Sequence, residues 1–193
     1  MKRSAKQHRK TKETDISIFL DLDTDKESKI TTPIPFFTHM LEIFARHSGF
    51  YMECDVKGDV DVDFHHTVED TGIVLGSVIK EALGDKCGIN RYGHLYIPMD
   101  EALARVVLDL SGRTYYHCNL GQSSGRIGTF DLDNCKHFFR SFADNLQLNL
   151  HIELLYGEDR HHIIEAAFKG VARSLKHAVQ VTGTRIPSTK EKL

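Results

Sequence analysis

The motif His-His-x-x-Glu occurs twice in the chain, as His65–Glu69 and as His161–Glu165. On a helix, residues four positions apart lie on one face, so the first histidine and the glutamate of each motif are able to bind one ion. The middle histidine is rotated by roughly 100° and points elsewhere. Imidazole and carboxylate ligands without a thiolate suit Mn, Fe, Zn, Co or Ni, and spacing does not choose among them. The repeated motif therefore predicts a paired metal site.

A lone histidine is more often a hydrogen-bonded core or surface residue than a metal ligand. This interpretation applies to six histidines of the chain: His8, His47, His94, His117, His151 and His177. Two adjacent histidines with a carboxylate at helical spacing are costly to bury unpaired, and this chain has them twice. For the duplicated motifs, metal binding is therefore the better interpretation.

The two motifs occupy the same place in an internal duplication. Glu13–Asp23 overlays Glu101–Ser111, because both segments share a glutamate, an apolar run and Leu-Asp-Leu. His39 overlays His137, and each is followed by a Phe-Ala pair five positions later. Internal repeats expose the architecture of a chain, and here they pair six of the twelve histidines. We predict repeats of about residues 13–88 and 101–183 within a domain of residues 11–193.

The hydrophobic periods predict the elements of each repeat. Alternating apolar residues predict strands near residues 16–22, 50–56 and 148–154. Helical spacing predicts one helix from Val68 to Leu83, ending before Gly84, and another from Ile164 to Val179, ending before Gly183. Strands thus alternate with helices twice, so we expect sheets that each carry one helical layer.

Composition narrows the class of protein. The 193 residues, 40% hydrophobic and 27% charged, are enough for a substantial core in one domain or two tightly fused small ones. A net charge of −2 argues against nucleic acid as a partner, and no apolar run approaches the roughly 20 residues that span a bilayer. The four cysteines form no Cys-x-x-Cys motif, and the sequence has no hydrophobic segment typical of a signal peptide. Both observations favour the reducing cytoplasm as the location of the protein. We expect the basic residues 1–10 to form a flexible tail.

Several longer segments carry a specific family resemblance. They are Pro35–Leu41, Asp63–Asp70, Tyr96–Glu101, Asp109–Arg113, His161–Lys169 and Pro187–Lys190. Together they resemble imidazoleglycerol-phosphate dehydratase in its monofunctional form, from about Lys10 to the C-terminus. Glu191 departs from the glycine usual in the Ser-x-Lys-Gly tail, at a flanking position only.

The resemblance implies a fold, an activity and an assembly. The fold would be α+β, an internal duplication of a ribosomal S5 domain 2-like two-layer α/β sandwich. The activity would be that of a hydro-lyase of histidine biosynthesis, which dehydrates imidazole glycerol phosphate to imidazole acetol phosphate through a metal-stabilised imidazolate. The partners would be this small phosphate substrate and further copies of the chain, in a 24-subunit shell built from trimers. Two Mn²⁺ ions per active site would lie at subunit boundaries.

The resemblance also implies ligands for the two ions. One ion would take His65, Glu69, His137 and His162. The other would take His161, Glu165, His39 and His66. Each set joins the first histidine and glutamate of one repeat to two histidines of the other repeat.

Further residues are implied for substrate and proton transfer. The removal of a weakly acidic carbon-bound hydrogen beside the imidazole needs a carboxylate, and Glu13 is the family's candidate, followed by Asp100 and Glu101. The implied substrate contacts, several of them in a C-terminal substrate-binding segment, are Glu13, Arg91, Arg113, Lys169, Ser188, Thr189 and Lys190. Guanidinium groups suit phosphate oxygens because their paired N–H donors match them.

Two other classes of function use similar ligands. A dinuclear metallohydrolase would use a metal-bound hydroxide as its nucleophile, and turnover of a phosphate or amide ester would favour it. A metal-storage assembly would need no substrate pocket, and the cations suited to phosphate argue against it.

Overall fold

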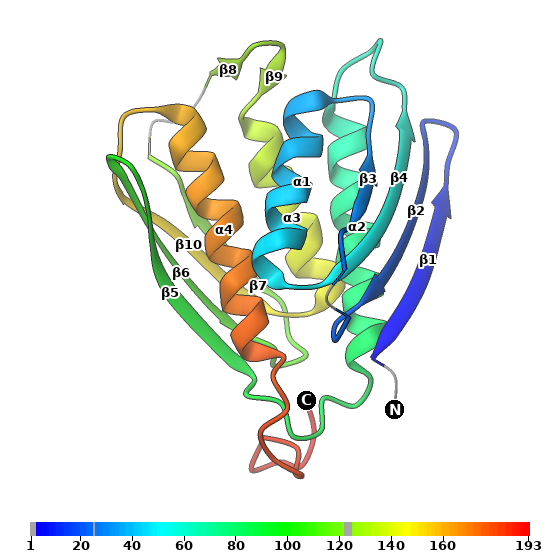
Figure 1. Cartoon of the computed structure of the whole chain (residues 1–193), viewed down its shortest axis with the longest axis vertical. Helices are drawn as coiled ribbons and strands as arrows, with labels where there is room; N and C mark the ends of the chain where they lie inside the picture. Colours follow the sequence, from blue (N-terminus) through cyan, green and yellow to red (C-terminus); the bar gives the residue numbers. More distant parts are fainter. Residues whose placement is uncertain (1–2, 25, 122–124) are drawn as a thin grey trace.

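The computed structural model describes residues 3–24, 26–121 and 125–193 of the chain. In this part, two four-stranded sheets enclose four helices (Figure 1). The first half contains β1 (Ser4–Lys10), β2 (Thr14–Asp21), β3 (Lys29–Thr31), α1 (Pro35–Ser48), β4 (Tyr51–Gly58) and α2 (His65–Leu83). The second half contains β5 (Tyr92–Met99), β6 (Ala102–Asp109), β7 (Tyr115–Asn119), α3 (Asp133–Leu146), β10 (Asn149–Tyr156) and α4 (Arg160–Ala178). A small hairpin, β8 (Arg126–Ile127) and β9 (Phe130–Asp131), precedes α3.

The two halves have the same topology. The strand orders are β1-β2-β4-β3 and β5-β6-β10-β7. In each sheet the first three strands are antiparallel and the last is parallel to its neighbour. This confirms the predicted α+β fold with an internal duplication of a sheet-and-helix unit. Each half also contains a strand, β1 or β5, that lies before the predicted start of its repeat.

The prediction of a flexible tail over residues 1–10 is wrong for Ser4–Lys10, which form β1. This strand pairs with β2 along its whole length, from Ser4 opposite Asp21 to Lys10 opposite Asp15. The hairpin lets the backbone of this edge strand bond to β2, and Lys10 Nζ also lies 2.8 Å from Asp15 Oδ2. The sequence did not predict this strand, because Ala5 is its one buried apolar residue and the basic side chains give no apolar alternation. Met1 and Lys2 lie outside the described residues.

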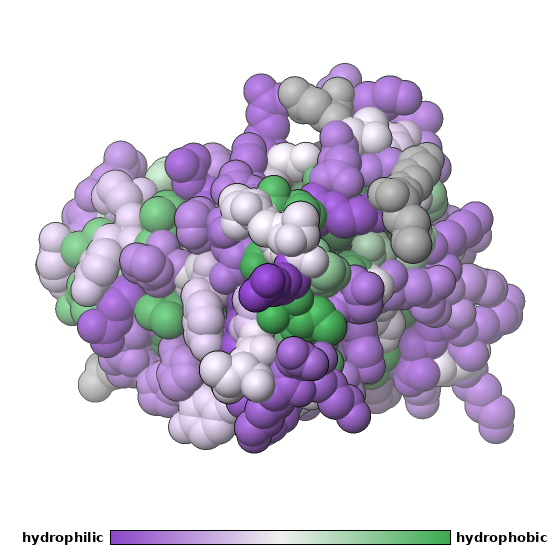
Figure 2. All heavy atoms as spheres, turned by 90° about the horizontal axis from the view of Figure 1, so that it is seen from below, coloured by the Kyte–Doolittle hydropathy of each residue, from purple (hydrophilic) through white to green (hydrophobic). Residues whose placement is uncertain are grey.

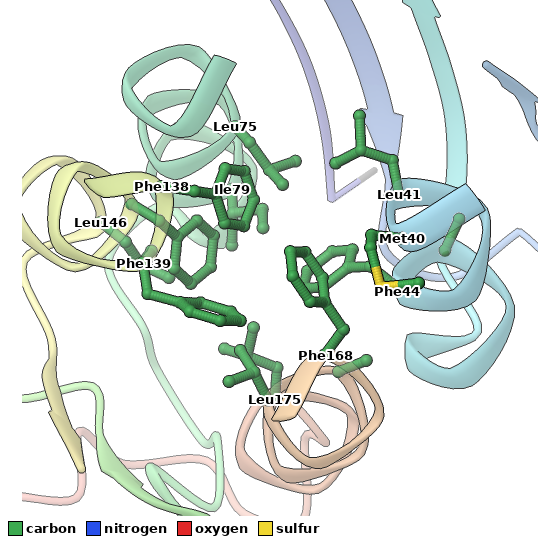
Figure 3. Packing of buried hydrophobic residues seen from close by; sticks show 14 of the residues in the cluster. Met40, Leu41, Phe44, Leu75, Ile79, Phe138, Phe139, Leu146, Phe168 and Leu175 are labelled. Carbon is green, nitrogen blue, oxygen red and sulfur yellow. The ribbon is translucent and has the colours of Figure 1, made fainter. Parts of the chain in front are cut away.

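The hydrophobic core lies between the sheets and joins both halves (Figure 3). All four helices contribute fully buried side chains, among them Phe44, Leu75, Phe138 and Phe168. The rings of Phe138 on α3 and Phe168 on α4 stack at 5.3 Å between centroids. Full burial of such a side chain stabilises a fold by about 1.5–3 kcal/mol. Because one cluster runs through both repeats, each half depends on the other for its core.

The helices of the two halves pair crosswise, α2 with α3 and α1 with α4. Two glycines allow α2 to approach α3 closely. A Cβ at Gly72 would lie 2.6 Å from the carbonyl oxygen of Phe138, and one at Gly76 would lie 2.5 Å from that of Phe142. Backbone atoms thus meet without side chains between them. This crosswise pairing places residues from one repeat beside residues from the other.

Replacement of Gly76 by alanine is expected to destabilise the protein. Overpacking costs about 1–3 kcal/mol, whereas alanine gains only about 1 kcal/mol in helix propensity over glycine, so the clash with Phe142 prevails. Urea unfolding measures the difference. Lys80→Ala, at an exposed position of the same helix, serves as the control and should stay within about 0.5 kcal/mol of the parent. Equal stability of Gly76→Ala and the parent would show that α2 and α3 separate at no cost.

Within residues 3–24, 26–121 and 125–193, none of the helices combines the length and the hydrophobicity of a membrane span.

Candidate metal centre and cationic pocket

The first histidine cluster lies between α2 and α3. His65 and Glu69 share a face of α2, with His65 Nε2 2.9 Å from Glu69 Oε2. His137 of α3 packs against His65, with 4.4 Å between ring centroids. One ligand atom from each of the three residues lies within 4.8 Å of the others. The predicted spacing of the motif thus produces a convergent set of two imidazoles and one carboxylate.

The second cluster is its repeat equivalent, between α1 and α4. His161 Nε2 lies 3.2 Å from Glu165 Oε2, and His39 Nε2 lies 3.7 Å from the same oxygen. The ring of Phe36 packs edge-on against His161 at 5.4 Å, which restricts the orientation of the imidazole. Ligand atoms of His39, His161 and Glu165 again lie within 4.8 Å of one another.

The two clusters differ in charge. Glu165 is 11% exposed and Lys169 Nζ lies 2.6 Å from its Oε1, whereas Glu69 is 39% exposed. Burial raises the pKa of Glu165, but the hydrogen bond and charge of Lys169, together with His161, outweigh burial and lower it. Isoleucine occupies the repeat equivalent of Lys169, residue 73. The structure therefore places Lys169 beside the second cluster, and its predicted contact with substrate phosphate stays a prediction.

The middle histidines of both motifs turn away from the clusters of their own chain. His66 Nδ1 lies 3.1 Å from Asp59 Oδ2, and His162 Nδ1 lies 2.7 Å from Glu101 Oε2. Among the described residues, each cluster therefore brings together three of the four residues in its implied ligand set. The hydrogen bonds to Asp59 and Glu101 raise the pKa of His66 and of His162, respectively.

Glu101, a predicted catalytic candidate, lies in the β5–β6 turn and is tied to the start of α4. Its Oε1 accepts the backbone N–H groups of Asp159 at 2.8 Å and Glu158 at 3.2 Å. The hydrogen bond from His162, followed by that from Asp159, lowers the pKa of Glu101 to about 2. The neighbouring Asp100 is exposed, and its Oδ2 lies 3.6 Å from His162 Nε2.

Glu13, the other predicted proton carrier, is exposed in the β1–β2 turn. The turn is fixed to α2 by the buried carboxylate of Asp70, which accepts from Thr14 Oγ1 at 2.6 Å and from Arg9 Nε at 3.1 Å. Asp70 directly follows Glu69, so Glu13 is held at the end of α2 that carries the first cluster. Sequence reasoning missed this role of Asp70. The sequence did carry a signal for this role, because the repeat equivalent of Asp70 is the apolar Ala166. A charged residue at a position that is apolar in the other repeat indicates a specific partner.

A cationic pocket of about 590 Å³ lies beyond the C-terminal end of α4. Its lining is Arg91, Tyr92, Arg113, Pro187, Ser188, Thr189, Lys190, Lys192 and Leu193. Arg91 binds both oxygens of Asp109, at 2.7 and 3.1 Å, and donates to the carbonyl of Pro187 at 2.8 Å. Arg91 thus holds the C-terminal segment in place, while Arg113 and Lys190 are exposed. Figure 2 looks at this end of the molecule, where hydrophilic side chains cover most of the surface.

The two clusters lie at the starts of α2 and α4, at one end of the molecule, and the C-terminal segment that lines the pocket follows α4 at the other end (Figure 1). His161 begins this helix, and the backbone N–H of Arg91 donates to the carbonyl of Ala178 at its end. At 1.5 Å per residue, these ends are about 25 Å apart. The predicted ligands are therefore far from the phosphate contacts predicted in the pocket, whereas Lys169 lies beside the second cluster.

Comparison with known proteins decides the family. The imidazoleglycerol-phosphate dehydratase family model matches residues 32–175. The chain belongs to this family. It is 50% identical to the imidazoleglycerol-phosphate dehydratases of Citrifermentans bemidjiense and Geobacter sulfurreducens, in each case over 100% of both chains. Membership makes the chain an enzyme, a hydro-lyase, and so argues against the metallohydrolase and the storage assembly.

Solved structures agree with the family assignment. The crystal structure of imidazoleglycerol-phosphate dehydratase from Staphylococcus aureus superimposes with a TM-score of 0.83 and 40% identity, covering 93% of this chain and 99% of that one. The enzyme from Pyrococcus furiosus, crystallised in complex with (S)-C348, gives a TM-score of 0.86 and 36% identity, covering 97% and 100%. The duplicated fold described above is thus the fold of the family.

Proposed function

We propose that this chain dehydrates imidazole glycerol phosphate to imidazole acetol phosphate in histidine biosynthesis, with the help of two divalent metal ions. The observation that carries the metal dependence is the pair of histidine clusters, one at each crosswise helix pair. Two imidazoles and one carboxylate within 4.8 Å suit a divalent cation. Manganese, implied by the family resemblance, is our choice of ion, because the donor set itself accepts several metals.

The ligand set implied by the family gives each ion a fourth protein ligand, which its own chain does not bring to it. We assign His162 to the ion of His65, Glu69 and His137. We assign His66 to the ion of His39, His161 and Glu165. Both histidines sit at helix starts with Nδ1 bonded to a carboxylate, which leaves Nε2 as the nitrogen for a metal ion. At the start of α4, Asp100 Oδ2 lies 3.6 Å from His162 Nε2. A neighbouring subunit in a homo-oligomer, which we take to be a 24-subunit shell of trimers in the cytoplasm, would supply them.

Different residues of the chain have different roles in the proposed reaction. When bound, the metal ions would supply Lewis acidity to the ring nitrogens of the substrate. Glu13 takes the hydrogen of the chain carbon next but one to the ring as a proton, and the hydroxyl on the ring-attached carbon leaves with that proton as water. The enol that remains tautomerises to the ketone of the product. Arg113 and Lys190 bind the phosphate, and Ser188 and Thr189 complete the turn around it. Arg91 keeps that turn in place through Asp109 and Pro187.

The direct test is incubation of the metal-loaded protein with imidazole glycerol phosphate. Formation of imidazole acetol phosphate, detected by mass spectrometry, is the expected result, and loss of this product after chelation would support the metal dependence. Hydrolysis of the phosphate without dehydration would contradict the proposal.

Chelation is also expected to loosen the assembly. If ligands from two subunits share an ion, metal binding adds free energy to association as well as to folding. Light scattering with and without a chelator measures the change, and smaller species should dominate in the metal-free sample. A metal-loaded monomer that remains fully active would refute the shared site. Re-addition of metal serves as the control, because it should restore the large species.

A further inference from the structure

We propose that Glu101 is a positioning residue that selects the tautomer of His162, so that Nε2 is free to bind metal, and that it carries no proton in the reaction. The inference rests on the proposed metal centre and reassigns a residue predicted above as a catalytic candidate.

The contacts of Glu101 leave its carboxylate little freedom. One oxygen accepts two backbone N–H groups that precede α4, those of Glu158 and Asp159. The other oxygen lies 2.7 Å from His162 Nδ1. Asp159 is the N-cap of α4 and its side chain accepts the backbone N–H of His162. The histidine and the carboxylate are therefore both anchored to the same helix start.

This arrangement fixes the chemistry of the imidazole. An ionised carboxylate only accepts hydrogen bonds, so Nδ1 of His162 must carry the hydrogen. A neutral histidine with hydrogen on Nδ1 has its free lone pair on Nε2, the atom available to a metal. Such carboxylate–histidine pairs orient metal ligands in many proteins, and their loss typically weakens metal affinity by 10–100-fold.

The duplication supports a separation of this task from proton transfer. Glu101 and Glu13 occupy equivalent positions in the repeats, and so do His162 and His66. The carboxylate that binds His66 Nδ1, however, comes from Asp59, which lies after β4. In the first half, Asp59 thus orients the histidine, and the Glu13 carboxylate is available to the substrate. The two equivalent glutamates have diverged into a proton carrier and a positioning residue.

Glu101→Gln in the full-length protein separates the two roles. The carbonyl oxygen of Gln still accepts the backbone N–H groups before α4, so thermal unfolding of the metal-free protein should change little. Its NH₂ group cannot accept from Nδ1–H, so His162 is driven to the tautomer with hydrogen on Nε2. We expect calorimetric titration of chelated protein with Mn²⁺ to show one of the two ions bound 10–100-fold more weakly. Turnover should recover at saturating metal.

A double-mutant cycle with His162→Ala tests whether Glu101 acts through the histidine. In the His162→Ala background, Glu101→Gln should weaken Mn²⁺ no further. Glu158→Gln is the matched control, because it removes an exposed charge at the same helix start and leaves the acceptor for Nδ1 intact.

Three results would overturn the inference. Parental metal affinity with a turnover that stays low at saturating metal would make Glu101 a proton carrier. An equal loss of affinity in both backgrounds would show that Glu101 does not act through His162. Unchanged affinity in His162→Ala alone would remove this histidine from the proposed ligand set, and the positioning role of Glu101 with it, while the dehydratase assay would still test the proposed reaction separately.

Discussion

Glu13→Gln is expected to lower the turnover number by about 10²–10⁴-fold, the usual contribution of a positioned general acid or base. Glutamine keeps the size and the hydrogen-bonding capacity of the side chain but cannot take a proton. The β1–β2 turn is held by Thr11, Thr14 and Asp70 rather than by the Glu13 side chain, so the geometry of the turn should persist. Metal content and substrate affinity should therefore be largely preserved.

Steady-state kinetics, elemental analysis and direct substrate binding on the same preparation measure these three quantities. Lys12→Gln is the control, since it alters an exposed charge in the same turn and should leave turnover near that of the parent. Near-normal turnover of Glu13→Gln would move the proton-transfer role to Asp100 or to Glu101. The second of these outcomes would also contradict the positioning role that we propose for Glu101.

The features that sequence reasoning predicted well are those set by local periodicity. The alternation in residues 16–22 and 148–154 became β2 and β10, and the helical spacing from Val68 to Leu83 lies within α2. The spacing of His65 and Glu69 placed both on one face, because a helix repeats every 3.6 residues. Such patterns depend only on the backbone geometry of one helix or strand, so they can be predicted from the sequence without knowledge of the rest of the fold.

What escaped prediction depends on contacts between distant segments. β1 is a strand because it pairs with β2, and its basic side chains gave no apolar alternation. Asp59 is one of three alternating aspartates before α2, and nothing in the sequence distinguishes it as the partner of His66. The crosswise pairing of helices, which brings His137 to His65, was implied only by the family resemblance. The metal role of these residues stays a prediction.

The distance between the histidine clusters and the cationic pocket predicts that one active site uses residues of two subunits. The substrate is a five-membered ring, a three-carbon chain and a phosphate, which together are far shorter than the about 25 Å of α4 that separates the two sites. If the ring lies at a histidine cluster, its phosphate does not reach Arg113 of the same chain. The proposed active site must therefore combine the cluster of one subunit with the cationic pocket of another.

Mixing two inactive variants should consequently restore activity. His137→Ala removes a ligand of the first cluster, and the double variant Arg113→Ala/Lys190→Ala removes the exposed cations of the pocket, so each assembly alone should be nearly inactive. After chelation, mixing in equal amounts and re-addition of metal, about a quarter of the sites would join an intact cluster to an intact pocket from a different chain, if subunits exchange at random. Turnover should rise to the same fraction of the parental value.

The control mixture pairs His137→Ala with His65→Ala. Both residues belong to the cluster of one chain, so every first cluster in this mixture lacks a ligand and activity should not return. Native mass spectrometry of the mixtures establishes that mixed assemblies have formed. If they have formed and the cluster-plus-pocket mixture still stays inactive, both sites serve the substrate from within one chain, and α4 or the C-terminal segment must rearrange to bring them together.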